Sequence, residues 1–180
     1  KAYKENIDIH TLTASQVFDI PIDSITSKER GEAKGVNFGI VYGISDYGLS
    51  ENLGISRKKA RTYIDSYFET YPTVKNYLDQ LILDCKDKGY VETIMGRRRT
   101  ITDINASNFT RRSFAERTAM NTPIQGSAAD IIKMAMIKVY RALKDNHLKS
   151  ELILQVHDEL IIDTVREEVD QVKKLLKDNM

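Results

Sequence analysis

The strongest constraint on the fold is a β-hairpin pattern near the end of the chain, because apolar residues elsewhere recur mostly at helical spacing. In LILQVHDELIIDTV, residues 152–165, two short apolar runs flank the polar residues His157, Asp158 and Glu159. Short apolar runs separated by a polar turn are typical of paired antiparallel strands. The sequence therefore predicts a hairpin with an acidic tip in a mainly helical protein of the α+β class.

Glycine, proline and capping residues divide the rest of the chain into helices joined by short turns. Helices are predicted in DIHTLTASQVFDI, TSKERGEAKGVNFGIVYG, DYGLSENLG, TVKNYLDQLILDCKDKG and EEVDQVKKLLKDNM, and from Ser56 to Pro72. The segment YVETIMGRRRTIT alternates and turns at Gly96, which predicts a second, smaller hairpin. After it, a helix is predicted from Asn105 until Pro123 breaks it, followed by a separate helix in GSAADIIKMAMIKVYRALKDN.

Composition and charge indicate an ordinary globular protein with no strong overall attraction for nucleic acid. The 180 residues include 27 Lys and Arg against 26 Asp and Glu, so any basic binding surface must be local. The single cysteine, Cys85, excludes an intramolecular disulfide framework. No apolar run reaches the roughly 18 residues of a membrane span, and the opening KAYKENIDIH lacks the apolar core of a signal peptide. A cytoplasmic protein of one or two domains is expected.

A row of two cations and two aromatics is the first candidate binding feature. Its members fall four residues apart, each followed by glycine: Arg30, Lys34, Phe38 and Tyr42. On a helix capped by Thr26 or Ser27, with Glu29 in its first turn, this row spreads over about 120° of one face. Phosphates near the helix N-terminus and a flat base two turns further on would fit a nucleoside triphosphate. The alternative is that the aromatics are buried core and the cations a solvated edge.

The acidic tip of the predicted hairpin is the second candidate feature. Asp158 and Glu159 could both reach one hard cation at a turn, and Mg²⁺ takes one or two carboxylates together with substrate oxygens. The alternative is an ordinary polar turn. His157 could be a zinc ligand, but one cysteine and two distant histidines disfavour zinc. Taken together, the row and the tip suggest phosphoryl or nucleotidyl transfer.

Several segments resemble family A DNA polymerases, the group that includes the bacterial DNA polymerase I enzymes. KGVNFGIVYG, preceded by Arg30, is similar to their fingers helix, and QVHDE is similar to their third palm motif. DIHTLTA, YFETYP, GYVET, GRRR, INASN and NTPIQGSAADIIK resemble the family in the same order. The resemblance implies a fingers subdomain over residues 1–105 and part of an antiparallel-sheet palm over 106–180. It also implies addition of dNTPs to a primer 3′ end with two Mg²⁺ ions and release of pyrophosphate.

The resemblance assigns roles to particular residues of this sequence. His10, Arg30, Lys34, Phe38 and Tyr42 would bind the incoming nucleotide, with Lys34 also assisting departure of pyrophosphate. Asp158 would be a metal carboxylate and Glu159 its weaker neighbour. Primer-template DNA would be contacted by Arg111, Arg112, Arg117, Asn121, Gln125 and His157. The triplet Arg97 to Arg99 would suit phosphates or be a solvated turn.

The match to the family is incomplete. A first catalytic aspartate, in a motif of the type DYSQIELR upstream of DIH, is not in this sequence, nor is a thumb. The sequence is therefore interpreted as an inactive fragment of a cytoplasmic, nucleoid-associated enzyme, and apolar surfaces left by truncation are expected to favour self-association. Two alternatives are an enzyme like the single-subunit RNA polymerases and a non-catalytic nucleic-acid-binding module.

Overall fold

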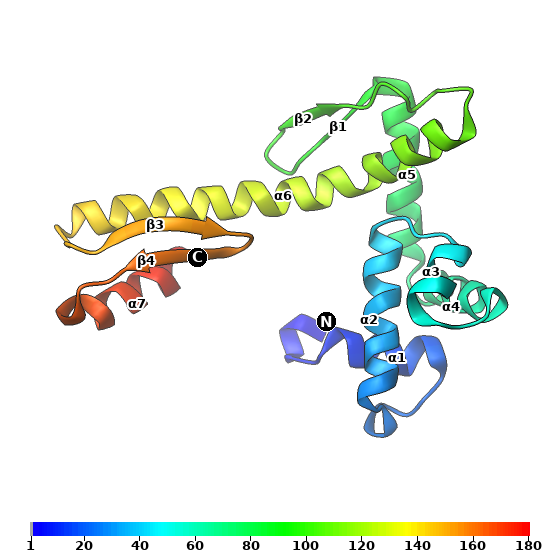
Figure 1. Ribbon diagram of the computed structural model, residues 1–180, viewed down its shortest axis with the longest axis horizontal. Coiled ribbons are helices and arrows are strands. Elements are labelled where there is room, and N and C mark those ends of the chain that lie inside the picture. The colour runs from blue at the N-terminus through cyan, green and yellow to red at the C-terminus, as the bar shows by residue number, and fades with distance from the viewer. Residues whose placement is uncertain (1) are drawn as a thin grey trace. The chain divides into compact units, whose positions relative to one another are not determined.

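The structure is a computed structural model that describes residues 2–180 (Figure 1). Lys1, with which the predicted fingers subdomain begins, lies outside the described residues. The chain forms two compact units. The first unit comprises the chain up to Val91 together with Arg99–Asn121, and the second comprises Glu92–Arg98 together with Thr122–Met180. The subdomain boundary at residues 105 and 106 stays a prediction. No helix in the described part of the chain is long and apolar enough to cross a membrane.

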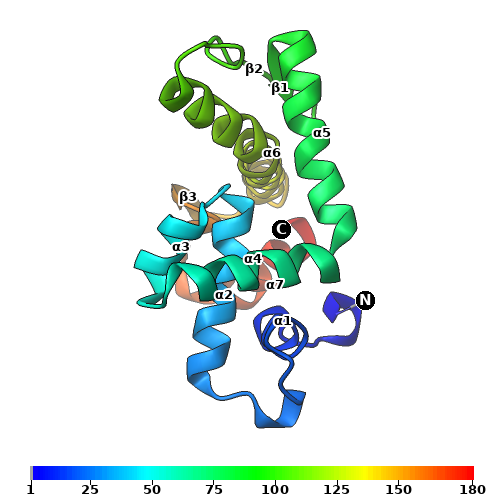
Figure 2. The same ribbon diagram turned by 90° about the vertical axis from the view of Figure 1, so that its right-hand side faces the viewer.

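Helices make up most of the first unit (Figure 2). They are the 3₁₀ turns η1 (Ala2–Glu5) and η2 (Ile22–Ser24) and the α-helices α1 (Ile9–Phe18), α2 (Ser27–Val41), α3 (Asp46–Leu53), α4 (Arg57–Thr70) and α5 (Pro72–Lys88). Three predicted helix boundaries are confirmed. Ser56 caps the start of α4, and Gly54 and Gly89 end α3 and α5 in the left-handed backbone conformation. Helix α1 packs against both α2 and α4.

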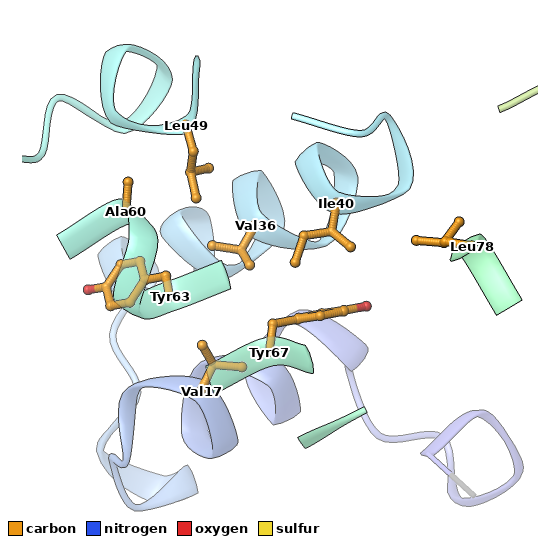
Figure 3. Close-up of a cluster of buried hydrophobic side chains, with 8 residues drawn as sticks. All are labelled: Val17, Val36, Ile40, Leu49, Ala60, Tyr63, Tyr67 and Leu78. Carbon is orange, nitrogen blue, oxygen red and sulfur yellow. The ribbon is translucent and has the colours of Figure 1, made fainter. Parts of the chain in front are cut away.

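The main core of the first unit fixes the orientation of α2. Its buried side chains come from five helices and include Val36 and Ile40 of α2 and Tyr63 and Tyr67 of α4 (Figure 3). Burial of such side chains contributes roughly 1.5–3 kcal/mol each. Because Val36 and Ile40 face inward, the opposite side of α2, which carries Lys34, faces outward.

Strands β1 (Tyr90–Glu92) and β2 (Arg98–Thr100) pair in a two-stranded sheet, so the smaller predicted hairpin is confirmed. Gly96 has φ of +76°, a left-handed conformation that glycine adopts without strain, and the chain turns there as expected.

Helix α6 (Phe109–Asp145) contradicts the prediction of two helices separated at Pro123. The helix starts at Phe109 rather than Asn105 because the Asn108 side chain caps it, accepting a hydrogen bond from the Arg111 backbone N–H at 3.1 Å. It continues through Pro123 although an internal proline costs roughly 3 kcal/mol. Apolar side chains are buried on both sides of the proline: Ala115, Ala119, Ile132, Ala135, Val139 and Leu143. This burial outweighs the lost hydrogen bond.

The second unit contains the acidic hairpin. Strands β3 (Glu151–Val156) and β4 (Glu159–Asp163) pair antiparallel, with a register irregularity between Leu152 and Leu154. One face packs on α6 and on α7 (Val169–Asn179), which follows the 3₁₀ turn η3 (Arg166–Glu168). The shared core contains Val139, Leu143, Val172 and Leu175. The predicted α+β class, with a helical first part and an antiparallel hairpin late in the chain, is confirmed.

Candidate functional site

The predicted cation and aromatic row lies on α2, which starts where the capping signal indicated. Thr26 is the N-cap, its hydroxyl accepts a hydrogen bond from the Lys28 backbone N–H at 3.2 Å, and its own backbone N–H donates to the Glu29 carboxylate at 3.0 Å. This reciprocal capping box fixes the first turn of the helix, which ends with Arg30, and Lys34 follows one turn later.

The aromatic part of the row is accessible. Phe38 and Tyr42 are 47% and 45% exposed, so the alternative that they are buried core is wrong. Their rings lie nearly parallel, with centroids 6.3 Å apart and an interplanar angle of 14°. The Lys34 ammonium Nζ lies 5.9 Å from the Phe38 ring centroid. The cation and the two rings therefore form one continuous surface that can meet a ligand with an anionic end and a flat end.

Two of the glycines that follow members of the row, Gly35 and Gly39, allow close packing. A Cβ on Gly35 would lie 2.7 Å from Leu53 Cδ2, and one on Gly39 would lie 2.7 Å from Ile44 Cγ2. Gly43 has φ of +66°, and its N–H donates to the Ile40 carbonyl while the Ile44 N–H donates to the Gly39 carbonyl, at 3.0 and 2.8 Å. This pair of bonds is a Schellman motif, which ends α2 at Val41 with Tyr42 as its C-cap.

A pocket of about 700 Å³ opens beside this surface within the first unit. Lys34, Phe38 and Tyr42 line it, and Arg117 of α6 contributes a further cation. The Arg117 guanidinium donates to the Ser113 hydroxyl at 2.8 Å, one turn earlier on the same helix. Arg117 was predicted to bind DNA, and the structure brings it to the same pocket as the predicted nucleotide residues.

Arg30, the first member of the row, does not line the pocket and forms an ion pair with Asp8. Its Nε and Nη2 donate to the two carboxylate oxygens of Asp8 at 3.0 and 2.9 Å. Hydrogen bonds from Arg30, then from Thr11, hold the pKa of Asp8 well below its ordinary value. Asp8 is a site residue that the sequence reasoning missed, since nothing in the spacing of residues 8 and 30 predicts their contact.

His10 lies beside the row on α1. Its ring centroid is 5.8 Å from that of Phe38, and Asn37 Nδ2 lies 3.0 Å from His10 Nδ1. Burial lowers the pKa of His10, partly opposed by the nearby carboxylate of Asp8, so the ring is neutral near pH 7. In the neutral ring, a hydrogen bond from the Asn37 amide to Nδ1 places the ring proton on Nε2. Asn37 stands within the KGVNFGIVYG motif, but its role requires α1 to be in place.

Two other predicted DNA-binding arginines make hydrogen bonds within the first unit. Arg111 pairs with Asp103 at 2.8 Å, and Arg112 donates to the backbone carbonyls of Ala106 and Ser107 at 2.8 and 3.2 Å. These bonds hold the turn that precedes α6. An arginine fork has five N–H donors, so both side chains retain donors for a phosphate.

Asn121 and Gln125 lie further along α6. The Oδ1 atom of Asn121 is buried and accepts no hydrogen bond from a described residue, whereas Gln125 is exposed.

The basic triplet near the turn of the β1–β2 hairpin is partly occupied by structural contacts in the second unit. Arg97 pairs with Asp130 at 2.8 Å and also donates to the Gly126 carbonyl at 3.1 Å. Arg98 pairs with Glu92 at 2.6 Å. These contacts attach the turn to α6 and leave less of the triplet available to DNA.

The acidic tip is well exposed in the second unit. His157 and Asp158 form the two-residue turn, with His157 at φ of +52°, and Glu159 is the first residue of β4. All three side chains are exposed. Within residues 2–180, no group of three or more His, Cys, Asp and Glu side chains is arranged to hold a metal ion. Two adjacent carboxylates offer hard oxygen donors, which fit part of the coordination shell of Mg²⁺.

Comparison with known proteins identifies the family to which these features belong. The model of DNA polymerase family A matches residues 1–180. The chain belongs to DNA polymerase family A. DNA polymerase I of Streptococcus pneumoniae R6 is 55% identical over 181 residues, and that of Bacillus subtilis 168 is 56% identical over 180 residues. Each alignment covers 100% of this chain but 21% and 20% of the relative, so the chain spans about a fifth of the length of these family A polymerases.

A solved polymerase structure shares the fold. It is the POL domain of Pol1 from M. smegmatis in complex with DNA primer-template and dNTP. The TM-score is 0.94 at 40% identity, over 99% of this chain and 31% of that one.

Proposed function

We propose that this chain is the fingers and part of the palm of a DNA-directed DNA polymerase. The proposed reaction joins a primer 3′ oxygen to the α-phosphorus of a dNTP. The bond from that phosphorus to the pyrophosphate oxygen breaks, and the hydroxyl proton leaves to a base. The observation that carries the proposal is the exposed surface of Lys34, Phe38 and Tyr42 beside a pocket, in a family A chain. The related POL domain is described with primer-template and dNTP, the substrates proposed here.

The nucleotide roles follow from the chemistry of the row. Arg30 would bind the phosphates as a cation in the first turn of α2, where the helix dipole also favours an anion, and Lys34 would add a second cation one turn later. His10 would add a neutral N–H donor from Nε2. Phe38 and Tyr42 would contact sugar and base through their exposed ring faces. Lys34 would also offset the charge that develops on the departing pyrophosphate.

Magnesium would be held by Asp158 together with Glu159, because adjacent exposed carboxylates match its preference for oxygen ligands. When bound, two such ions would stabilise the charge on the attacking and leaving oxygens. In this proposal a further aspartate, of the kind carried by the family's DYSQIELR-type motif, completes the metal site. The isolated chain is therefore expected to be inactive.

Primer-template DNA would be bound through local contacts, since the net charge is +1. Arg117, Asn121, Gln125 and His157 would contact primer and template, with Arg111 and Arg112 offering their remaining N–H groups to phosphates.

Primer extension tests the proposed function. The isolated chain is compared with a hybrid enzyme in which it replaces the matching residues of Bacillus subtilis DNA polymerase I, to which it is 56% identical. We expect extension by the hybrid only. Lys34→Ala in the hybrid should lower kcat by about 100-fold or more, as removal of one charge-stabilising donor does in other enzymes.

Lys28→Ala is the matched control, because it removes an exposed cation from the same helix outside the pocket. Equal activity of the Lys34→Ala and Lys28→Ala hybrids would contradict the nucleotide site. A hybrid that binds primer-template but never extends it would indicate a non-catalytic binding module instead.

A further inference from the structure

Asp8 and Arg30 form a two-point clamp between α1 and α2. Arg30 Nε donates to Asp8 Oδ1 at 3.0 Å, and Arg30 Nη2 donates to Asp8 Oδ2 at 2.9 Å. The carboxylate is itself anchored, because Asp8 Oδ1 also accepts from the Thr11 backbone N–H and hydroxyl, both at 2.8 Å. Asp8 therefore caps α1 and at the same time restrains the guanidinium of Arg30.

The clamp leaves the other side of the guanidinium open. Of the five N–H donors of an arginine, Asp8 uses the Nε donor and one on Nη2, so three remain on Nη1 and Nη2. The Arg30 side chain is 45% exposed, and an anion can reach these donors without displacing Asp8. A guanidinium that is already held in one orientation loses less conformational entropy on binding phosphate than a mobile one does.

We propose that Asp8 is a positioning residue for the nucleotide, which holds Arg30 so that its free N–H groups face the triphosphate. This inference rests on the proposed function, because it assigns Asp8 to the phosphate end of the same site. It goes beyond that function in naming an acidic residue as favourable for binding an anion. A carboxylate near a triphosphate would otherwise be expected to repel it.

Whether Asp8→Asn weakens or strengthens dNTP binding distinguishes a positioning role of Asp8 from electrostatic repulsion of the triphosphate. In Asp8→Asn, the amide can still cap α1 by accepting from the Thr11 N–H, because Asn and Asp are about equally good N-caps. Its amide nitrogen cannot accept from Arg30, so the two-point clamp is lost. Positioning predicts weaker dNTP binding in this variant, whereas repulsion predicts tighter binding.

The experiment measures KM and kcat for dTTP in the hybrid enzyme, with and without Asp8→Asn. We expect KM to rise about three- to tenfold, which corresponds to the cost of ordering one flexible side chain, while kcat changes little. Asp65→Asn is the matched control, because Asp65 also pairs with an arginine of the first unit, Arg61, at 3.1 Å, and neither residue lines the pocket or adjoins a lining residue in the chain. It should leave KM unchanged.

A double-mutant cycle tests whether Asp8 acts through Arg30. In an Arg30→Ala background, Asp8→Asn should have no further effect on KM, while a purely structural role for Asp8 would lower activity in both backgrounds. An unchanged or lower KM in the single variant would overturn the positioning role even if the hybrid is a normal polymerase. A wild-type hybrid without nucleotide turnover would instead overturn the proposed function and, with it, this inference.

Discussion

At the scale of single residues, the glycines of α2 differ in what surrounds them, and their substitutions should have opposite effects. A Cβ on Gly31 would meet no atom within 4 Å, so Gly31→Ala should stabilise the first unit by about 1 kcal/mol through helix propensity. A Cβ on Gly39 would lie 2.7 Å from the branched Ile44 side chain, so Gly39→Ala should destabilise it by about 1–3 kcal/mol. Urea unfolding of the two variants measures both. Stabilisation by both would show that Ile44 is not packed against α2 as described.

Residue chemistry explains why the candidate site could be predicted only in part. The four-residue spacing of Lys34 and Phe38 is a property of one helix, so the sequence alone predicts that they share a face. The partners of Arg30 and His10, namely Asp8 and Asn37, are brought together by the packing of α1 on α2. No local pattern encodes that contact, so neither partner could be predicted from the sequence.

At the scale of secondary-structure elements, the acidic hairpin was predictable and the long helix was not. The β3–β4 turn follows from polar residues between two apolar runs, a local signal. Helix α6 continues through Pro123 because apolar residues on either side of it are buried, and this tertiary gain is not visible in local propensity.

The start of β3 depends on one carboxylate, which should make the second unit sensitive to acid. Glu168 accepts hydrogen bonds from the Lys149 and Ser150 backbone N–H groups at 3.0 and 2.9 Å and from the Ser150 hydroxyl at 2.6 Å. These bonds, that of Lys149 first, lower the pKa of Glu168 from its ordinary value of 4.5. A carboxylate with a lowered pKa in the folded state stabilises the fold fully above that ordinary value. The stabilisation is lost as the pH falls below it.

Glu168→Gln tests this acid sensitivity. Thermal melts between neutral pH and about pH 3 should show a lower melting temperature for the variant at neutral pH, and a difference from wild type that shrinks as the pH falls through the range below about 4.5. Glu167→Gln changes the neighbouring exposed carboxylate and should follow the wild-type profile. A constant difference at all pH values would mean that the Glu168 charge does not hold the start of β3.

At the scale of the whole molecule, charge and exposed apolar surface decide how the chain interacts. A net charge of +1 gives little long-range attraction for DNA and little repulsion between copies. The second unit exposes large apolar side chains on β3, β4 and α6: Ile131, Met134, Ile137, Tyr140, Ile153, Leu154, Val156 and Ile161. Each strand of the described β3–β4 sheet also has one unpaired edge. Both features favour association in a nearly neutral protein.

We therefore expect the isolated chain to self-associate through its second unit. Its mass in light scattering should rise with protein concentration, and Leu154→Lys should reduce the rise because it places a charge on a strand residue that is 53% exposed. Leu83→Lys is the control, since Leu83 of α5 is 59% exposed in the first unit. Equal reduction by both variants would indicate a general effect of added charge rather than a surface on β3. A monomer mass at every concentration would contradict self-association itself, and the exposed strand face would then be compatible with a stable single copy.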